Sequence, residues 1–587
     1  MDYALLGVVG IITVVTVARF AAKLGIAAPL VLVVVGIGFS YLPGVPAIEV
    51  GPELILAGVL PPLLYSAAIQ VPLVDFRRNL RSIFGLSVLL VVVTAFLVGL
   101  FLYAVLPALS LPAAIALGAV VSPTDAVAAT AIAKRLGLPP RLVTVLEGES
   151  LVNDASALVL LKAATTAAAV VGVGASAGAE AAIDLGEVGV MFSYSVVMAV
   201  VLGLVIGFIT VFVRSKLRDP VLDTAVSFAV PFLAYIPAEE LGASGVLAVV
   251  VVGIYTGHNS ARFLSSPSRI SERVNWRTAQ FLLENGVFLL MGGEIKAVIA
   301  EVHADDLGAD RAVLLGIATV AILVVVRFLF VWPLLGWLRR SGRNARKTNR
   351  RMAAGLMRLR NRASGDERFQ RRQQRAERVY RRRENDLAAS ASEEFGWRGG
   401  LVLSWSGMRG VVTVAAAQSL PAETPYRPQL ILIAFTVAVV TLLLQGGTLP
   451  WLIRLTGIQG SDGVADRREL AMLLDEVAST GIQALPEAVA ALPALSQPPR
   501  EVLERVRRDT LLRSAAAWEQ VERPEEESTL GPHAQYLHLR RAVLIAEREA
   551  LLEVRSRGEY SSRVLRRAQA MLDAEESRLE QDDTSHS

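Results

Sequence analysis

The chain has 587 residues, of which 53% are hydrophobic and only 19% are charged. A soluble globular domain is usually about 45–50% apolar and about 25% charged, so this composition excludes an ordinary soluble protein. Cysteine is absent, which excludes disulfides, thiolate metal sites and cysteine nucleophiles, and the net charge of +4 conceals strong local segregation.

A membrane helix needs about 20 mainly apolar residues, and the chain before Leu455 contains thirteen such stretches. They are centred near Ile11, Val34, Pro61, Val92, Val121, Ala155, Leu202, Val230, Val249, Leu289, Leu323, Val411 and Val439. The first stretch carries Asp2 where a secretory signal carries basic residues, and no small-residue cleavage pattern follows it. It is therefore predicted to be a true membrane helix.

The loops between these stretches alternate in charge. Basic residues follow the odd-numbered stretches, at Arg19 and Lys23, Arg77, Arg78 and Arg81, Lys134, Arg135 and Arg141, Arg214, Lys216 and Arg218, and Arg262, Arg269 and Arg273. The intervening loops are acidic or uncharged. By the positive-inside rule, we expect a multi-pass protein of the cytoplasmic membrane with its N-terminus outside and its C-terminus in the cytoplasm.

Two segments are polar enough to lie outside the membrane. The loop 339–398 is rich in arginine and is predicted to be a solvated helix or a connector, or alternatively a segment attracted to anionic lipid headgroups. Nucleic-acid binding is not expected, because no aromatic stacking pattern accompanies the arginines. Residues 458–587 have helical periodicity and are predicted to form a helical cytoplasmic tail, separate from a transmembrane domain over 1–457. Regulation or dimer contact by the tail is left open.

The fifth stretch carries polar residues in the middle of a helix rich in Ala, Val and Ile, at Ser122, Pro123, Thr124 and Asp125. Pro123 removes a backbone donor and clashes with the preceding turn, so the helix is predicted to kink or break there. Broken backbone at membrane depth is tolerated only where it is buried in protein or lines a wet cavity. Charges inside spans are costly and rare, which makes Asp125 a candidate functional residue.

The sixth stretch carries a second polar group, Glu149, Ser150, Asn153 and Asp154. Residues four apart share a helix face, so Ser150 lies beneath Asp154, and Glu149 lies beneath Asn153 on the adjoining face. Burial favours a neutral carboxylic acid, whereas a bound cation favours the carboxylate, so Asp154 can hold a proton or a metal cation but not both. That competition is the minimum chemistry of an exchanger. The alternative is that these carboxylates only form interhelical hydrogen bonds or ion pairs.

A second polar interruption occurs late, from Ser404 to Gly410. If stretches one to six and eight to thirteen are inverted repeats, the fifth stretch corresponds to the twelfth, and paired interruptions indicate a transporter site. Asp125 at an N-terminal half-helix end and Arg409 near a C-terminal one could neutralise the partial charges there. The alternative for Arg409 is snorkelling from a helix end, which the flanking glycines disfavour.

Four motifs stand out, at Leu60–Tyr65, Ser122–Ala128, Gly148–Ala155 and Gly407–Gly410. In combination they resemble the monovalent cation:proton antiporter-1 family, the NhaP-type sodium/proton exchangers. The resemblance covers about Ala4 to Gly457. It implies an all-α polytopic membrane protein with thirteen helices in two inverted repeats, broken crossing helices and a homodimeric assembly. It also implies alternating access, in which a core bundle moves against a dimerisation bundle.

The resemblance also implies roles for particular residues. Asp154 corresponds to the residue that binds the cation or the proton, while Ser150 and Thr124 correspond to ligands of the alkali cation or their close neighbours. Asn153 corresponds to a supporting residue. The transported ions are substrates, and no cofactor is implied.

Three further positions follow from the same resemblance. Arg327 is a charge inside an apolar stretch and resembles the arginine that forms a structural ion pair with Glu149. Glu284 resembles a membrane-embedded acidic position of some exchangers, with no role assigned. Many members carry an acidic residue where this chain has Ser66, which leaves the number of ligands and the cation preference open.

The leading functional hypothesis is a secondary active antiporter that exchanges sodium, or another alkali cation, for protons. Asn153 stands where a second carboxylate would add charge, so exchange is expected to be electroneutral. The alternatives are a potassium/proton antiporter, and a gated channel or sensor. A membrane enzyme is least favoured, because no nucleophile with a base and no metal cluster is found.

Overall fold

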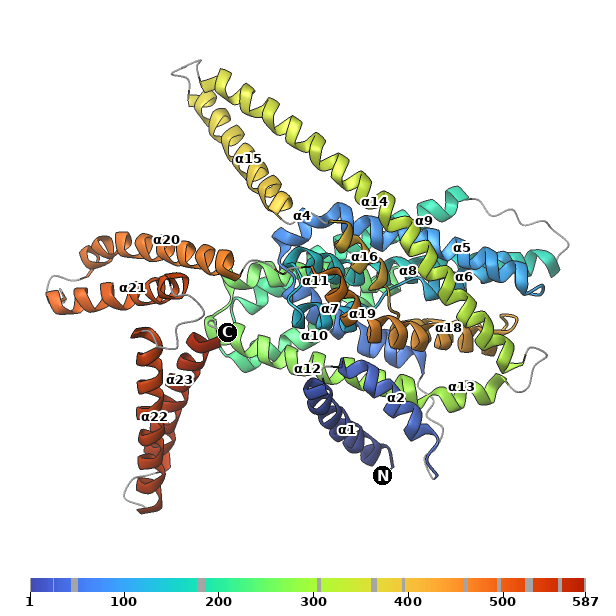
Figure 1. The fold of residues 1–587 in the computed structure, drawn as a ribbon, viewed down its shortest axis with the longest axis horizontal. Helices are drawn as coiled ribbons and strands as arrows, with labels where there is room; N and C mark the ends of the chain where they lie inside the picture. Colours follow the sequence, from blue (N-terminus) through green and yellow to red (C-terminus); the bar gives the residue numbers. More distant parts are fainter. Residues whose placement is uncertain are drawn as a thin grey trace. The chain divides into compact units, whose positions relative to one another are not determined.

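The computed structural model describes residues 2–24, 26–43, 51–176, 185–302, 308–360, 367–392, 396–458, 460, 463–492, 498–522, 532–557 and 562–584. Throughout these residues the regular structure is helical, with no strand. The chain divides into two compact units, Met1–Gly460 and Ser461–Ser587. Figure 1 shows the helices of both.

The first seven apolar stretches of the sequence all lie on helices of the first unit. These are α1 (Asp2–Leu24), α2 (Ala28–Ser40), η1 with α3 (Leu54–Val59, Leu60–Gln70), α4 with η2 and α5 (Leu73–Phe84, Gly85–Leu89, Leu90–Val105), α6 and α7 (Leu111–Val121, Ala126–Arg135), α8 (Pro140–Ser176) and α9 (Leu185–Arg214). The η segments are π-helical turns inside otherwise continuous helices. The fifth stretch is broken between α6 and α7, as Pro123 predicts.

The remaining six stretches also lie on helices. These are α10 (Pro220–Glu240), α11 (Gly245–Phe263), α12 (Ser266–Gly293), α14 (Ala309–Arg360), α16 and α17 (Trp397–Trp405, Val411–Gln418), and α18 with η3 and α19 (Arg427–Thr441, Leu442–Gly446, Gly447–Thr456). A short helix, α13 (Ile295–Val302), lies between α12 and α14. The late interruption is confirmed as a gap between α16 and α17.

Among the described residues, five helical segments are long and apolar enough to cross a membrane alone. They are Leu73–Val105, Gly189–Arg214, Pro220–Glu240, Ala309–Ala354 and Arg427–Thr456. Several others are shorter apolar helices, and each broken helix contributes two short halves. The all-helical membrane fold is therefore established, while the count of thirteen crossings stays a prediction.

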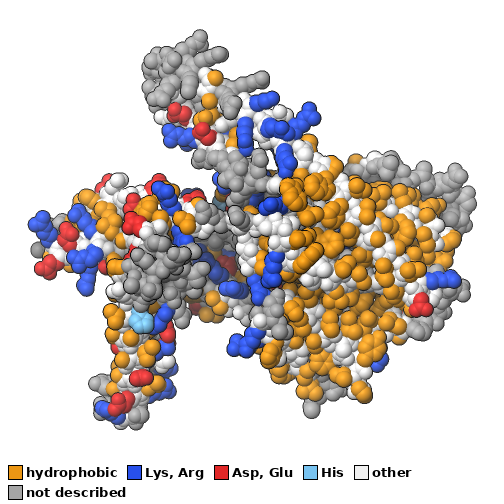
Figure 2. Space-filling view, in the orientation of Figure 1, with side chains coloured by type: hydrophobic (Ala, Val, Ile, Leu, Met, Phe, Trp, Pro, Cys, Tyr) orange, Lys and Arg blue, Asp and Glu red, His pale blue; other side chains and the backbone are white. Residues whose placement is uncertain are grey.

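The outside of the first unit is apolar over a broad face (Figure 2). Large hydrophobic side chains on several helices are more than half exposed, including Leu5, Ile12, Phe208 and Leu329. A soluble protein rarely exposes a contiguous apolar surface of this kind. Lipid covers such a surface at no cost, and the helices satisfy their own backbone hydrogen bonds.

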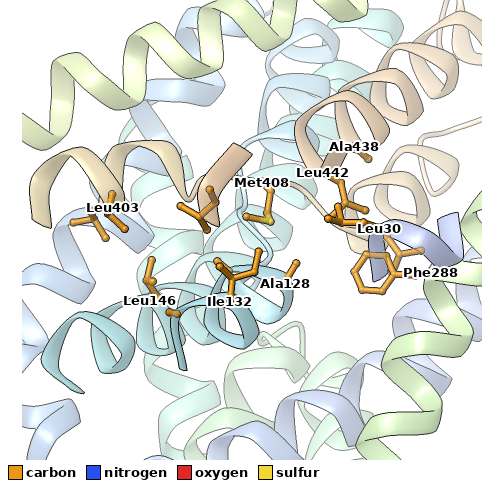
Figure 3. Close-up of a cluster of buried hydrophobic side chains, with 14 of the residues drawn as sticks. Leu30, Ala128, Ile132, Leu146, Phe288, Leu403, Met408, Ala438 and Leu442 are labelled. Carbon is orange, nitrogen blue, oxygen red and sulfur yellow. The ribbon is translucent and has the colours of Figure 1, made fainter. Parts of the chain in front are cut away.

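One cluster of buried hydrophobic side chains in the first unit includes the second interruption (Figure 3). Met408, between α16 and α17, is fully buried and belongs to one cluster with Leu30 of α2, Ile132 of α7, Leu146 of α8 and Leu442 of η3. Close packing of this kind resists changes of even one methylene group. The non-helical backbone at Met408 is thus packed against buried side chains of four other helical segments.

The basic loop 339–398 is largely helical. Helix α14 continues without interruption from its apolar part to Arg360, and α15 (Glu367–Ser392) runs back beside it (Figure 1). Asp386 of α15 accepts hydrogen bonds from Arg77 (3.3 Å) and Arg78 (2.8 Å) of α4. Of the two structures predicted for this loop, the helix is confirmed over the described residues, and 361–366 and 393–395 lie outside them.

The second unit consists of two helical pairs, which confirms the predicted helical character of the tail. Its helices are α20 (Gly463–Ala490), α21 (Arg500–Glu522), α22 (Pro532–Arg557) and α23 (Ser562–Thr584). Helix α22 packs on α23 through Leu537, Leu544 and Leu579. An ion pair between Arg540 and Glu575 (2.8 Å) joins the same two helices.

Candidate ion site

The two broken helices meet at their interruptions. The backbone N–H of Asp125 donates to the carbonyl oxygen of Met408 (2.8 Å). Gly410 lies so close to the Asp125 side chain that a Cβ atom at Gly410 would be 2.1 Å from Asp125 Oδ2. Asp125 therefore precedes the first turn of α7 and also faces the first turn of α17. Both helix N-termini carry positive partial charge, which a carboxylate at this position stabilises.

Arg409 faces the opposite helix ends. Its Nε donates to the carbonyl oxygen of Val121 (3.0 Å), the last residue of α6, and its Nη1 donates to the carbonyl oxygen of Gly407, just after α16. Its backbone N–H donates to Thr441 Oγ1 (3.0 Å). The residue is 2% exposed, so snorkelling towards an interface is excluded. A cation here stabilises the negative partial charge of the two C-terminal ends.

Glu149 and Arg327 form a buried ion pair behind the first interruption. Arg327 Nη1 lies 2.6 Å from Glu149 Oε1 and Nη2 lies 3.0 Å from Oε2, and both residues are 2% exposed. Arg327 Nε also donates to the carbonyl oxygen of Leu403 in α16 (3.1 Å). The pair therefore links α8, α14 and α16.

Thr124 and Asn153 extend this network to the broken backbone. Thr124 Oγ1 donates to Glu149 Oε1 (2.8 Å), and Asn153 Nδ2 donates to both Oγ1 (2.9 Å) and the carbonyl oxygen (3.0 Å) of Thr124. The two residues of α8 that share one face, Glu149 and Asn153, thus hold the interruption in place. The Thr124 hydroxyl lies on the side of the ion pair.

A cavity of about 450 Å³ lies on the other side of the interruption. Its wall includes Pro123, Asp125, Ser150, Asp154, Glu284 and Gly410, together with Gln280 and apolar residues of α3, α12 and α17. Ser150 and Asp154 face it from the same stripe of α8. Asp154 is 8% exposed, and no group in the described part of the chain donates a hydrogen bond to its carboxylate. The cavity thus combines several oxygen atoms with the Asp154 carboxylate, which accepts no hydrogen bond from the described residues.

Ser66 lies at the edge of this arrangement. Its hydroxyl donates to Gln280 Oε1 (3.0 Å), while Gln280 Nε2 donates to Glu284 Oε1 (2.6 Å). Ser66 is fully buried and does not line the cavity, whereas Gln280 and Glu284 do. Ser66, which stands where many family members carry an acidic residue, is therefore linked to Glu284 through the amide of Gln280.

A sequence profile of the family described as "Sodium/hydrogen exchanger, transmembrane" matches residues 9–455. The chain belongs to this exchanger family. An uncharacterized Na(+)/H(+) exchanger of Mycobacterium tuberculosis is 28% identical over 591 residues, 98% of this chain and 97% of its own. The Na(+)/H(+) antiporter ApNhaP of Aphanothece halophytica is 27% identical, over 76% of this chain and 72% of its own.

Two further similarities concern function and fold. A protein of Bacillus pumilus named "Sodium, potassium, lithium and rubidium/H(+) antiporter" is 29% identical, over 72% of this exchanger and 57% of its own length. The sodium proton antiporter MjNhaP1 of Methanocaldococcus jannaschii matches 78% of this exchanger and all of its own chain, with a TM-score of 0.55 at 16% identity. At that identity the structural likeness shows the shared fold.

Several polar residues of this exchanger were not anticipated from its sequence. Gln280 precedes Glu284 by one helical turn in α12, and that spacing is a signal that could have indicated it. Lys134 and Glu147 form an ion pair (2.7 Å) at the cavity wall. In sequence, Lys134 is recognisable only as a loop cation.

The third unanticipated group is a buried charge cluster. Arg214, expected in a cytoplasmic loop, is the last residue of α9 and only 1% exposed. It forms two bonds to Asp223 of α10 (2.8 and 2.9 Å), and its Nη1 lies 2.8 Å from Glu272 Oε1 of α12. Burying an arginine is tolerated where carboxylates compensate its charge, and here they come from two other helices, α10 and α12.

Proposed function

We propose that this chain exchanges an alkali cation for a proton across the cytoplasmic membrane, and that Asp154 carries both in turn. The supporting observation is the position of Asp154, which lines the cavity and accepts no hydrogen bond from the described residues. Ser150 lines the same cavity from the same stripe of α8. An alkali cation would take oxygen ligands from Asp154 and Ser150. Thr124 contributes by holding the interruption, and its role as a direct ligand would require its hydroxyl to leave Glu149.

The proposed exchange is electroneutral. Glu149 is neutralised by Arg327, and Asn153 supplies an amide where a second carboxylate would add charge. Asp125 faces the N-terminal ends of two helices, whose positive partial charge compensates a carboxylate at this position. Asp154 then exchanges one proton for one cation, and no net charge crosses the membrane.

We infer alternating access from the way the cavity is built. Its wall includes Lys134 and Glu147, and Lys134 lies in the last turn of α7, at the end that the charge pattern assigns to the cytoplasm. The structure would then be open to the cytoplasm, with the N-terminus outside and the C-terminus inside. A homodimer is inferred from the resemblance to the NhaP-type exchangers.

Sodium is the first candidate for the transported cation, and potassium is the alternative. The relative from Aphanothece halophytica is named for sodium, while that from Bacillus pumilus is named for sodium, potassium, lithium and rubidium. Ser66 stands where many members carry a carboxylate, so a ligand set with less charge is proposed here. A ligand set with less negative charge attracts a cation more weakly, and this favours a larger, more easily dehydrated cation relative to a small one.

The test uses purified protein in lipid vesicles with a preset pH gradient and a fluorescent pH reporter. Wild type is expected to collapse the gradient on addition of sodium, lithium or potassium, at a rate that saturates with cation concentration. Asp154→Asn is expected to abolish this exchange while leaving the protein folded. Asp310→Asn, which removes an exposed carboxylate from α14, is the matched control and should exchange like wild type.

Two outcomes would count against the proposal. Saturable exchange that survives in Asp154→Asn would remove Asp154 from the carrier role. Cation flux that proceeds without counter-movement of protons would instead favour a gated channel, the alternative from a different functional class.

A further inference from the structure

A second hollow lies on the surface of the first unit, away from the ion site. It has a volume of about 690 Å³ and lies between α4 with η2 and the apolar part of α14. Leu80, Phe84, Gly85 and Leu89 line one wall, and Leu329, Phe330, Pro333, Leu334 and Trp337 line the other. Typical ligand sites have volumes of about 300–1,000 Å³, so a sizeable ligand fits. We call this hollow the α4–α14 groove.

A glycine lets the two walls of the groove approach closely at one point. Gly85 has no side chain, and a Cβ atom there would lie 2.9 Å from Leu334 Cδ1 of the opposite wall. Phe84 and Trp337 are both more than half exposed, so the two aromatic rings border the groove without filling it. The groove therefore presents apolar walls to the surrounding lipid.

One end of the α4–α14 groove is cationic. Arg81 is the charged residue of its lining, and it donates to Ser341 Oγ of α14 (2.5 Å). Arg77 and Arg78 of the same helix pair with Asp386, whereas Arg81 pairs with no carboxylate among the described residues. An arginine with one neutral partner keeps most of its donors for an anion.

The basic end continues along α14. Pro333, Trp337 and Ser341 are spaced four residues apart and so form one stripe, and Arg340 lies one residue from that stripe. Arg340 is exposed and has no ion-pair partner in the described part of the chain. Tryptophan is enriched at membrane interfaces, so Trp337 marks the depth at which lipid headgroups lie.

We propose that the α4–α14 groove binds an anionic phospholipid, with an acyl chain along the apolar walls and the phosphate at Arg81 and Arg340. Charge complementarity selects the anionic class: two arginines without carboxylate partners meet the headgroup, and no acidic residue lines the groove. The charge pattern of the loops assigns this end of α4 to the cytoplasmic side, whose leaflet carries the anionic lipids.

The two elements that form the groove also reach the buried Glu149–Arg327 pair. Ser87 of η2 donates to the carbonyl oxygen of Glu149 (3.0 Å), while Leu329 follows Arg327 by two residues on α14. A lipid between these two elements would hold them at a fixed separation. Occupancy is therefore expected to stabilise the fold as well as to bind at its surface.

The test adds dioleoyl phosphatidylglycerol or dioleoyl phosphatidylcholine to the detergent-solubilised full chain. Native mass spectrometry counts bound lipids, and thermal unfolding measures stabilisation. Phosphatidylglycerol is expected to bind and to raise the melting temperature, and phosphatidylcholine is expected to do neither. One arginine near the membrane surface contributes about 1 kcal/mol, so Arg81→Gln should weaken phosphatidylglycerol binding about fivefold.

Two further variants complete the test. Arg218→Gln removes an exposed arginine from the loop after α9, and should bind phosphatidylglycerol like wild type. Leu329→Trp places a large side chain at a groove residue that is 69% exposed, and should displace the lipid without burying a clash. The proposal is overturned if both lipids bind and stabilise equally, or if Arg81→Gln and Leu329→Trp bind phosphatidylglycerol as tightly as wild type.

Discussion

The Glu149–Arg327 pair should contribute to the stability of the exchanger and not to the transport chemistry. Replacing either residue by alanine leaves the other charged and buried, since both are 2% exposed in the native structure. Without Glu149, Arg327 would lose the two oxygen atoms that accept its hydrogen bonds and would keep only its bond to the carbonyl oxygen of Leu403. Glu149 would keep only its bond from Thr124.

The loss of stability can be calculated from the cost of leaving one buried charge without its partner. Removing one partner of a buried ion pair costs about 3–5 kcal/mol. A loss of 1 kcal/mol lowers the melting temperature of a domain of 150–250 residues by about 2–4 °C, and by less in larger units, so a decrease on the order of 5–10 °C is expected here.

The measurement is thermal unfolding and yield of the detergent-solubilised protein for Glu149→Ala and Arg327→Ala. Exposed residues on nearby helices offer matched controls, Glu301→Ala in α13 and Arg311→Ala in α14, which should melt like wild type. The double variant Glu149→Ala with Arg327→Ala removes both charges. It should lose less stability than the sum of the two single changes, because contacting residues are energetically coupled.

Normal melting combined with loss of transport would refute this reasoning. If Glu149→Ala or Arg327→Ala behaved in that way, the residue would belong to the ion path. Asp154→Asn provides the opposite expectation, since it removes a carboxylate that no described protein group stabilises. That variant should melt at or above the wild-type temperature.

Two other predictions concern the interruption and the stoichiometry. Gly410→Ala should lower both stability and transport, because the new Cβ would lie 2.1 Å from Asp125 Oδ2. Gly336→Ala in α14, where no heavy atom of a neighbour lies within 4 Å, should exchange like wild type and melt no lower, because alanine is favoured over glycine inside a helix. A membrane potential imposed with valinomycin should leave the steady-state pH gradient unchanged. A gradient that follows the potential in wild type, but not in Glu284→Gln, would mean that Glu284 carries a second proton.

The sequence predicts the helices well because their signals are local. Apolar stretches, loop charges and Pro123 each act within a few residues of their position, and the structure places helices and breaks accordingly. The face-sharing of Glu149 with Asn153 and of Ser150 with Asp154 also follows from helix geometry alone. Periodicity did not show that the α8 face with Glu149 contacts Arg327, or that the face with Asp154 lines a cavity.

The remaining features depend on contacts between distant segments. Arg214 looks like a loop cation until Asp223 and Glu272 are brought against it from two other helices. Gln280 accepts the hydrogen bond from Ser66 only because α12 lies beside α3 in the fold. The extension of α14 into the basic loop is a further case, since a polar helical sequence and a connector are similar in composition.

Helix α8 carries a structural carboxylate, Glu149, and the proposed ion-carrying carboxylate, Asp154, within little more than one turn. Glu149 is satisfied completely by Arg327 and Thr124, so its charge is fixed and unavailable to an ion. Asp154 lies five residues later, faces the cavity and has no described donor, so a cation or a proton can satisfy it in turn. A helix that carries both groups must be held rigidly, because a rotation that exposed Glu149 would leave Arg327 uncompensated. The ion pair thus limits the motion of α8 to movements that α14 and α16 share, and we expect exchange to proceed by displacement of these helices together.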